Sequence, residues 1–308
     1  MPATDYQNLI DAETWAFVHQ TSEAYPENTA HLSIAEQRAI YDAMCRVFFR
    51  GYPPGIEAFD APLAGVPCRH YCTPGERPVV LYLHGGGFVV GGLHSHDDIC
   101  AEISCRTGLA VVSAEYRLSP EHQHPAAHED ALAVARALRS QGHSLVLVGD
   151  SAGGNLAAAA ARALRKESGP AILGQVLIYP GLGGDRTRGS YVTHAHAPML
   201  TTEDIAFYAG IRHAGIEPRG DATAAPLQDT DYSGLPPTFA IAAECDPSAD
   251  DAHAYAAAIT AAGGHARAVT EEGLVHSYLR ARATSARAAR SFDRIIDAIS
   301  AMSSGTWK

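Results

Sequence analysis

The residues best suited to carry out a reaction surround Ser151, in the segment Gly149-Asp150-Ser151-Ala152-Gly153. The apolar run 145–148 predicts a buried strand before the serine, and residues 151–166 predict a helix rich in small side chains. A tight turn from strand to helix needs glycines beside the serine, and it holds the serine in a strained conformation that exposes Oγ. Backbone N–H groups at the helix N-terminus favour a developing negative charge. The pattern therefore predicts Ser151 as the nucleophile of an acyl transfer.

A glycine-rich segment, His84-Gly85-Gly86-Gly87-Phe88, directly follows a second apolar run at 79–83. Consecutive glycines let the backbone approach a ligand closely and direct N–H groups toward it. In an acyl-transfer enzyme, donors to the oxyanion lie in such a loop, together with the N–H of the residue after the nucleophile, here Ala152. Phosphate binding is the competing interpretation, but the Lys-Ser/Thr pair and the loop length of a phosphate-binding loop are missing. We expect His84 to brace the loop by hydrogen bonding rather than to transfer protons.

The general base and its acid partner must come from distant loops at the same edge of the sheet. Among 16 histidines, His276 lies in a short loop after the last predicted strand, and Asp246 follows the strand before it. Asp250 is the alternative acid, although Asp250 and Asp251 are expected to cap the next helix. In the predicted triad Ser151 attacks, His276 shuttles the proton, and Asp246 fixes the histidine tautomer.

Strand and helix patterns alternate through most of the chain. Eight short runs predict strands, at 56–60, 67–72, 79–83, 110–114, 145–148, 175–179, 238–242 and 265–270. Helical patterns occupy 125–139, 151–166, 249–262 and about 283–302. Continuously apolar strands are buried on both faces, so this alternation predicts an α/β fold with a mostly parallel, doubly wound central sheet flanked by helices.

Two regions outside this alternation predict a helical cap over the site. Residues 1–50 are helical in pattern and precede the catalytic domain, which we expect at 51–308. Ser33-x-x-Glu36 is a capping box, and the apolar face of the helix after it is expected to comprise Ile40, Met44, Val47 and Phe48.

The second cap region is an insertion at about 184–216, inside an unusually long connection at 180–237. A capped helix is expected to start near Thr201. A long disordered loop is the alternative, but Phe207, Tyr208 and Ile211 mark an apolar helical face.

The charge and cysteine content of the chain limit its possible binding partners and its location. Lys and Arg total 23 against 34 Asp and Glu, so the net charge is −11, which disfavours nucleic acids and anionic membrane surfaces. The first residues show no secretory signal, and six scattered cysteines suggest free thiols in a reducing compartment. We therefore expect a cytoplasmic protein.

Two histidine-containing segments raise the alternative of a metal site. Cys68-x-His70-x-Cys72 lies in a predicted strand, where the three side chains would spread over roughly 13 Å, too far for one tetrahedral ion. His94-Ser95-His96-Asp97-Asp98 resembles the H-x-H-x-D run of metallo-hydrolases, with His122, His124 and His128 nearby in sequence. A metal-bound hydroxide would leave the serine turn and the three glycines unexplained, so we predict no metal and no other cofactor.

With these residues placed, the chain resembles the hormone-sensitive lipase-like esterases of the α/β-hydrolase superfamily. The resemblance covers most of residues 50–300 and rests on His84–Phe88, on Gly149–Gly154, and on Tyr116-Arg117-Leu118-Ser119-Pro120-Glu121-His122 followed by Pro125-Ala126-Ala127 and Glu129-Asp130-Ala131. It implies an α/β-hydrolase fold with a cap, and hydrolysis of carboxylic esters without a cofactor. It also implies that the N–H groups of Gly86, Gly87 and Ala152 form the oxyanion hole.

The chain departs from the family at two places. The acid segment, usually similar to DPLRDE, is Asp246-Pro247-Ser248-Ala249-Asp250-Asp251 here, and the residues after the histidine, usually Gly-Phe, are Ser277-Tyr278. The second departure predicts an unusual, more polar acyl or alcohol pocket.

The leading hypothesis is a carboxylesterase for small to medium acyl esters, with a small-molecule ester as its partner. An amidase or a specialised esterase could use the same triad. From another class, a non-catalytic small-molecule binder is disfavoured because Ser151, Asp246 and His276 are all present. An edge strand of the sheet would allow a homodimer.

Overall fold

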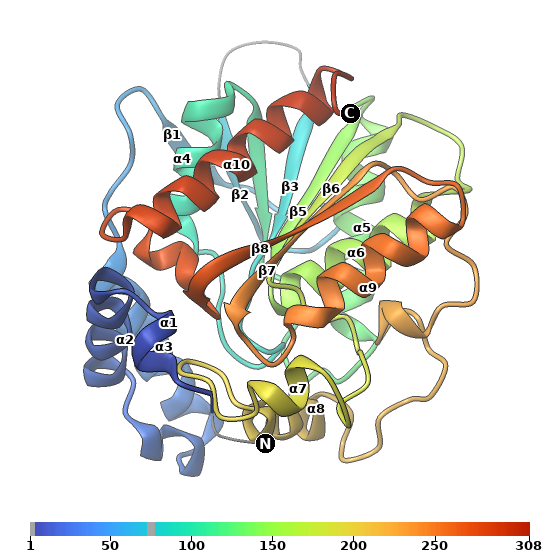
Figure 1. Cartoon of the computed structure of the whole chain (residues 1–308). Helices are drawn as coiled ribbons and strands as arrows, with labels where there is room; N and C mark the ends of the chain where they lie inside the picture. Colours follow the sequence, from blue (N-terminus) through green and yellow to red (C-terminus); the bar gives the residue numbers. More distant parts are fainter. Residues whose placement is uncertain (1–3, 73–77) are drawn as a thin grey trace.

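The apolar runs of the sequence form a single sheet in the computed structural model, which describes residues 4–72 and 78–308 (Figure 1). Within these ranges eight strands follow the order β1-β2-β4-β3-β5-β6-β7-β8. Their bounds are β1 Glu57–Asp60, β2 Cys68–Cys72, β3 Val79–Leu83, β4 Ala110–Ala114, β5 Leu145–Asp150, β6 Ile172–Ile178, β7 Thr238–Cys245 and β8 Ala266–Val275. Strand β2 is antiparallel to β1 and β4, whereas the other pairs are parallel. The predicted mostly parallel sheet is therefore confirmed.

Helices cover both faces of this sheet, and each layer encloses its own apolar core. Helices α4 (Asp97–Thr107) and α10 (Ala286–Ser303) pack on one face. Helices α5 (Ala126–Ser140), α6 (Ala152–Leu164) and α9 (Ala249–Ala261) pack on the other. Helix α4 was not expected from the sequence. It begins within the segment that resembles a metal-binding run, and its two N-terminal aspartates instead complement the positive end of the helix dipole.

The N-terminal region contains α1 (Tyr6–Leu9), α2 (Ala12–Ala24), the 3₁₀ helix η1 (Glu27–His31) and α3 (Ile34–Phe48). The capping box of Ser33 and Glu36 is present at the start of α3. The expected apolar face of α3 was partly wrong, because Val47 is 43% exposed. The helix packs on α2 through a face turned by one residue, which buries Gln37, Tyr41, Met44, Cys45 and Phe48.

The long connection between β6 and β7 contains α7 (Ser190–Thr193), α8 (Thr202–Arg212) and the 3₁₀ helix η2 (Pro226–Gln228). Thr201 and Asp204 form a capping box at the start of α8, where the sequence predicts a capped helix. In Figure 1 this region and α1–α3 lie below the carboxyl ends of the parallel strands. They lie over the edge at which the predicted catalytic residues emerge.

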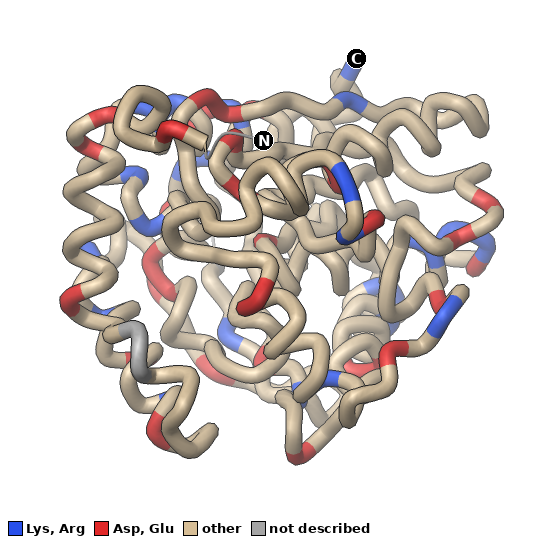
Figure 2. The backbone as a smooth tube through the Cα atoms, turned by 60° about the horizontal axis from the view of Figure 1, so that its bottom comes forward, with Lys and Arg blue, Asp and Glu red and all other residues tan. Residues whose placement is uncertain are grey.

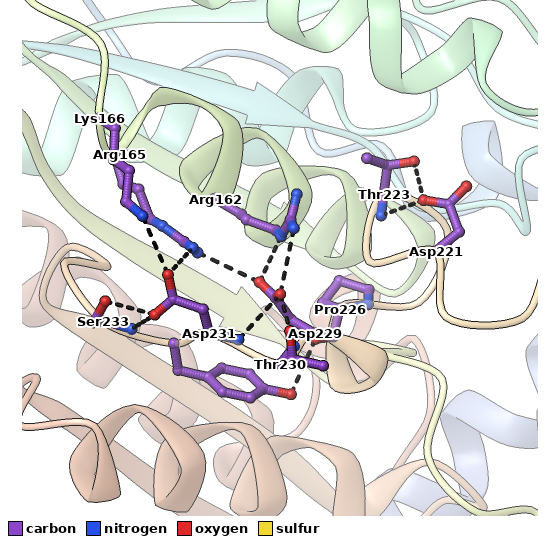
Figure 3. Close-up of polar contacts among 11 residues, drawn as sticks. Arg162, Arg165, Lys166, Asp221, Thr223, Pro226, Asp229, Thr230, Asp231 and Ser233 are labelled. Atoms are coloured by element: carbon purple, nitrogen blue, oxygen red, sulfur yellow. Dashed lines mark hydrogen bonds and ion pairs between the residues drawn. The ribbon is translucent and has the colours of Figure 1, made fainter.

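The last part of this connection is held to the body by ion pairs (Figure 3). Asp229 accepts from Arg162 and Arg165, and Asp231 accepts from Arg165 and Lys166. Because the three basic residues lie at or just after the end of α6, they fix the approach of the chain to β7.

Charged residues of both signs are interspersed along the chain (Figure 2). This distribution accompanies the net charge of −11. No helix in the described ranges has the length and apolar character that crossing a membrane requires.

Candidate active site

Ser151 sits between β5 and α6 in a conformation that few non-glycine residues adopt, with φ 53° and ψ −117°. Its N–H donates to the carbonyl of Ile178 at 2.9 Å, which holds the turn against the neighbouring strand. Gly153 is required by close approach, since a Cβ there would lie 1.9 Å from the carbonyl oxygen of Leu83. The expected strained turn is therefore present, and Ser151 projects from the carboxyl edge of the sheet into a cavity.

The structure brings His276 and Asp246 to Ser151 from the ends of two other strands. His276 Nε2 lies 2.8 Å from Ser151 Oγ, and His276 Nδ1 lies 2.6 Å from Asp246 Oδ2. Asp246 is fully buried, and its Oδ1 accepts from the N–H and hydroxyl of Ser248 at 2.7 and 2.8 Å. Such a chain of contacts can remove the proton from Oγ and stabilise the imidazolium that results.

Asp250, the alternative acid, contacts the connection between β6 and β7 rather than His276. Its carboxylate accepts from the N–H of Ser190 at 2.9 Å. Asp251 accepts from the N–H of Leu182 at 2.7 Å and the hydroxyl of Tyr191 at 3.0 Å, and burial raises its pKa to about 6. The expectation that both aspartates cap α9 was wrong, because their side chains reach across to the connection after β6.

The glycine loop after β3 turns beside Ser151. Gly86 has φ 123°, and its carbonyl accepts from the N–H groups of Val89 and Val90, which closes the turn. In the described part of the chain, the N–H groups of Gly86, Gly87 and Ala152 donate to no protein acceptor. Gly86, Gly87, Ala152, Ser151 and His276 all line the same cavity, as an oxyanion hole requires.

Asp150 joins the glycine loop to the serine turn, a role that the sequence analysis missed. Its Oδ1 accepts from the N–H of Gly85 and the hydroxyl of Tyr82, each at 2.9 Å, and His96 Nε2 lies 3.2 Å from Oδ2. Burial alone would raise the pKa of this carboxyl, but His96, Arg280 and the Tyr82 hydrogen bond hold it below its usual range. The position of an acidic residue directly before Ser151 could have indicated this role from the sequence.

His84 contacts the loop that it was expected to brace. Its Nδ1 lies 2.7 Å from the carbonyl of Gly85, and its ring stacks on Tyr116 with centroids 4.2 Å apart. The hydroxyl of Tyr116 donates to the His84 carbonyl at 2.7 Å. Burial lowers the pKa of His84 to about 4, so the ring is neutral at physiological pH. A buried, neutral histidine that does not contact Ser151 fits a structural role.

The cavity above Ser151 has a volume of about 380 Å³. Helices α3 and α8 supply much of its apolar wall, including Tyr41, Met44, Ile205 and Tyr208. The ring of Tyr208 lies so close to Gly87 that a Cβ there would approach it to 2.6 Å. The side chains of Arg212 and Arg280 also line the cavity and add charged groups to its largely apolar wall.

Neither metal-site alternative gains support from the described residues, in which no group of three or more His, Cys, Asp or Glu side chains could hold an ion. His96 contacts Asp150, while Asp98 pairs with Arg282 at 2.9 Å. His70 lies 3.0 Å from the carbonyl of Ala61. The side chain of Cys72 lies outside the described part of the structure.

Comparison with known proteins gives a consistent result. Residues 80–280 match the family described as α/β hydrolase fold. The esterase LipI of Mycobacterium tuberculosis is 37% identical over 238 residues, which cover 72% of this chain and 73% of LipI. An ethyl acetate hydrolase of Pseudomonas putida is 33% identical over 234 residues, covering 70% of this chain and 72% of that protein.

Solved structures resemble the whole chain. DphMB1 superimposes with a TM-score of 0.86 at 31% identity, covering 98% of this chain and all of DphMB1. An esterase from the bacterial hormone-sensitive lipase family also has a TM-score of 0.86, at 28% identity, covering 95% of this chain and 98% of that structure.

Proposed function

The chain belongs to the α/β-hydrolase-fold family and is a carboxylic-ester hydrolase, and from this premise we propose that Ser151, His276 and Asp246 are its catalytic triad. The observation that carries the proposal is the continuous chain of contacts from Ser151 Oγ through His276 to Asp246. As Oγ attacks the ester carbonyl, His276 Nε2 takes its proton, while Asp246 holds the Nδ1–H tautomer and stabilises the imidazolium.

The carbonyl oxygen gains negative charge in this step, and the N–H groups of Gly86, Gly87 and Ala152 are proposed to stabilise it. The C–O bond to the alcohol then breaks, and His276 gives its proton to the departing alkoxide, leaving an acyl ester on Ser151. Water attacks this ester with His276 as base, which releases the carboxylic acid and restores the hydroxyl. The reaction consumes one water per ester and needs no cofactor.

The cavity supports a preference for small to medium acyl esters. Its volume of about 380 Å³ lies near the lower end of the range typical for ligand pockets. Since its wall is largely apolar, short alkyl chains would gain from burial there, whereas long chains would exceed the space.

Replacing Ser151 with alanine tests the triad. The variant should retain the far-UV circular dichroism and melting temperature of the wild type, but lose at least about 10⁴-fold in kcat for p-nitrophenyl butyrate. A fluorophosphonate should label the wild type and not the variant. Retained esterase activity in folded Ser151→Ala would contradict the proposal. A matched butyramide, measured in parallel, separates an esterase from an amidase.

The cap, location and assembly are part of the same proposal. Residues 1–50 and about 184–216 would form the cap, which is supported by the contribution of α3 and α8 to the cavity wall. A cytoplasmic location is supported by the free thiols of Cys45, Cys68, Cys100, Cys105 and Cys245. Strand β8 is an edge of the sheet and supports a homodimer, which light scattering after size-exclusion chromatography would test.

A further inference from the structure

Arg280 is a buried cation on the wall of the cavity, only four residues after His276. It lies in the 3₁₀ helix η3 (Tyr278–Ala281), and only 5% of its surface is exposed. Its Nη2 donates to the hydroxyl of Tyr41 at 2.6 Å and approaches Cys45 Sγ at 3.6 Å. Arg280 and Tyr41 both line the cavity that contains Ser151.

Within the part of the chain that the structure describes, no anionic side chain contacts the Arg280 guanidinium. The hydrogen-bond partners of the guanidinium are the Tyr41 hydroxyl and the Cys45 thiol, and it forms no ion pair with a described carboxylate. Burial raises the pKa of both the Tyr41 phenol and the Cys45 thiol, so both groups are neutral at physiological pH. Burial by itself would lower the pKa of Arg280, but neighbouring groups, Asp150 among them, hold it above its usual value, so the guanidinium stays charged. The Asp150 carboxylate is itself occupied by hydrogen bonds within the serine turn and glycine loop.

Two other arginines with buried side chains are paired with carboxylates, whereas Arg212 and Arg280 on the cavity wall form no ion pair with the described residues. Arg282 pairs with Asp98 at 2.9 Å and Glu102 at 2.8 Å, and Arg165 pairs with Asp231 at 2.9 Å. Buried charges are ordinarily paired in this way, because taking an isolated ion out of water costs several kcal/mol. Arg280 lacks such a partner and faces the substrate cavity.

The guanidinium of Arg280 also has N–H donors without an acceptor in the described part of the protein. Arg280 Nε is buried and has no hydrogen-bond partner, and Nη1 donates to no residue in the described ranges. Arg212, the other buried arginine on the cavity wall, is better satisfied. It donates to the carbonyl of Ala224 at 3.1 Å and lies over the ring of Phe88, and burial lowers its pKa to about 9.

We infer that Arg280 binds an anionic group of the substrate, so that the preferred esters carry a carboxylate on their acyl or alcohol portion. This inference rests on the proposed ester hydrolysis at Ser151. A guanidinium carries one positive charge and matches a carboxylate in charge and in hydrogen-bond geometry. Arg280 is thus a specificity-determining residue, and the neutral Tyr41 phenol positions it.

The experiment compares esters of similar length with and without the acid. In the acyl arm, p-nitrophenyl hydrogen glutarate is compared with p-nitrophenyl hexanoate. In the alcohol arm, 4-acetoxybutanoate is compared with pentyl acetate by pH-stat titration. The wild type should show a kcat/KM at least about tenfold higher for the acidic ester in one arm, the gain expected for a charged hydrogen bond. This preference would oppose the general repulsion of anions by a protein of net charge −11.

Variants then assign the preference to Arg280. Arg280→Met should lower kcat/KM for the acidic ester at least about tenfold, mainly through KM, and change that for the neutral ester less than about threefold. Arg280→Lys should retain part of the preference because it keeps the charge. Arg186→Gln is the matched control, since Arg186 also lines the cavity but is paired with Glu217 at 2.8 Å, and it should leave the ratio unchanged.

Two outcomes would overturn the inference: no preference for the acidic ester in either arm, or an equal loss for both esters in folded Arg280→Met. If Arg280→Met does not fold, the wild-type ratios alone decide. Failure of the underlying triad would look different, because folded Ser151→Ala would then still hydrolyse the neutral ester. Failure of this inference alone leaves neutral hydrolysis dependent on Ser151 without an acid preference.

Discussion

The sheet edge that carries the proposed triad, here called the catalytic edge, and the wall of the cavity are held in different ways. Ser151 and Asp246 are attached directly to strand ends, and buried hydrogen bonds fix them in place. The wall contributed by α8 is looser, since Arg212 is the buried residue of that helix and its other side chains are half-buried or exposed. Apolar packing, such as the contact of Tyr208 with Gly87, accounts for much of its attachment.

This difference separates the reaction from the choice of substrate. Acyl transfer needs reacting groups fixed to within a fraction of an ångström, and strand ends in a packed sheet provide this precision. The cavity wall needs only the right volume and polarity. Substitutions at the catalytic edge should therefore reduce kcat for every ester, whereas substitutions in α8 should change the preference among esters.

The largest effect is expected for Asp246→Asn. The asparagine fits the same space, but its amide can donate to His276 Nδ1 and favour the wrong tautomer. We expect kcat for p-nitrophenyl butyrate to fall by about 10⁴ while the fold is retained. Steady-state kinetics together with a thermal melt check both parts. A loss of less than about tenfold would show that another group orients His276.

Asp150→Asn should have the next largest effect. The asparagine would lack the negative charge that accepts from the N–H of Gly85 and faces His96, so the glycine loop would be held less firmly beside Ser151. We expect kcat to fall roughly 10²–10³-fold, as for the loss of one oxyanion donor. Fluorophosphonate labelling would continue at a reduced rate. Wild-type kcat in this variant would show that the loop is held in place without Asp150.

Asp251, which contacts the connection between β6 and β7, should make the stability of the protein depend on pH. Its pKa is about 6 in the folded protein against 3.8 for an exposed aspartate, so the folded state binds this proton more tightly. Stability from this group is therefore present below about pH 4 and is lost as the pH rises to about 6, by about 3 kcal/mol.

Asp251→Asn tests this dependence. Buried histidines with lowered pKa values, such as His84 and His128, act in the opposite direction over the same range. The measurement is therefore the difference in free energy of unfolding between variant and wild type, from urea titrations at pH 4.5 and 7. That difference should move in favour of the variant as the pH rises, and a constant difference would contradict the prediction.

Tyr208→Ala should have the smallest effect on activity, and that effect should be confined to the preference among esters, which the cavity wall determines. Removing the ring enlarges the cavity above the glycine loop, so the preferred acyl chain should lengthen. We expect kcat/KM for p-nitrophenyl butyrate to change by less than about tenfold, and hydrolysis of the octanoate to improve relative to it. Ile216→Ala, in the same connection but 82% exposed, is the control and should leave the chain-length profile unchanged.

The sequence predicted the sheet and the local parts of the site because both depend on neighbouring residues. Strands buried on both faces require continuous apolar runs, and the turn at Ser151 requires small residues at fixed spacing. His276 and Asp246 could be selected because the ends of parallel strands share one edge of the sheet. The capping box at Ser33 is similarly local.

The features that were missed or wrong depend on contacts distant in sequence. The segment that starts α4 contains histidines and aspartates whose spacing resembles a metal site, and only the fold shows that His96 reaches Asp150. The orientation of α3, which exposes Val47, depends on its partner α2. Arg280 resembles any surface arginine until Tyr41, 239 residues earlier in the chain, is placed against it.

The way in which the cavity wall is assembled has an evolutionary consequence. Helix α3 precedes the first strand in sequence, whereas α8 lies in the connection between β6 and β7, and neither helix is part of the central sheet. Mutations in these helices can accumulate without disturbing the strand ends that carry the proposed triad. Related proteins can therefore evolve different substrate preferences while they retain the same hydrolytic reaction.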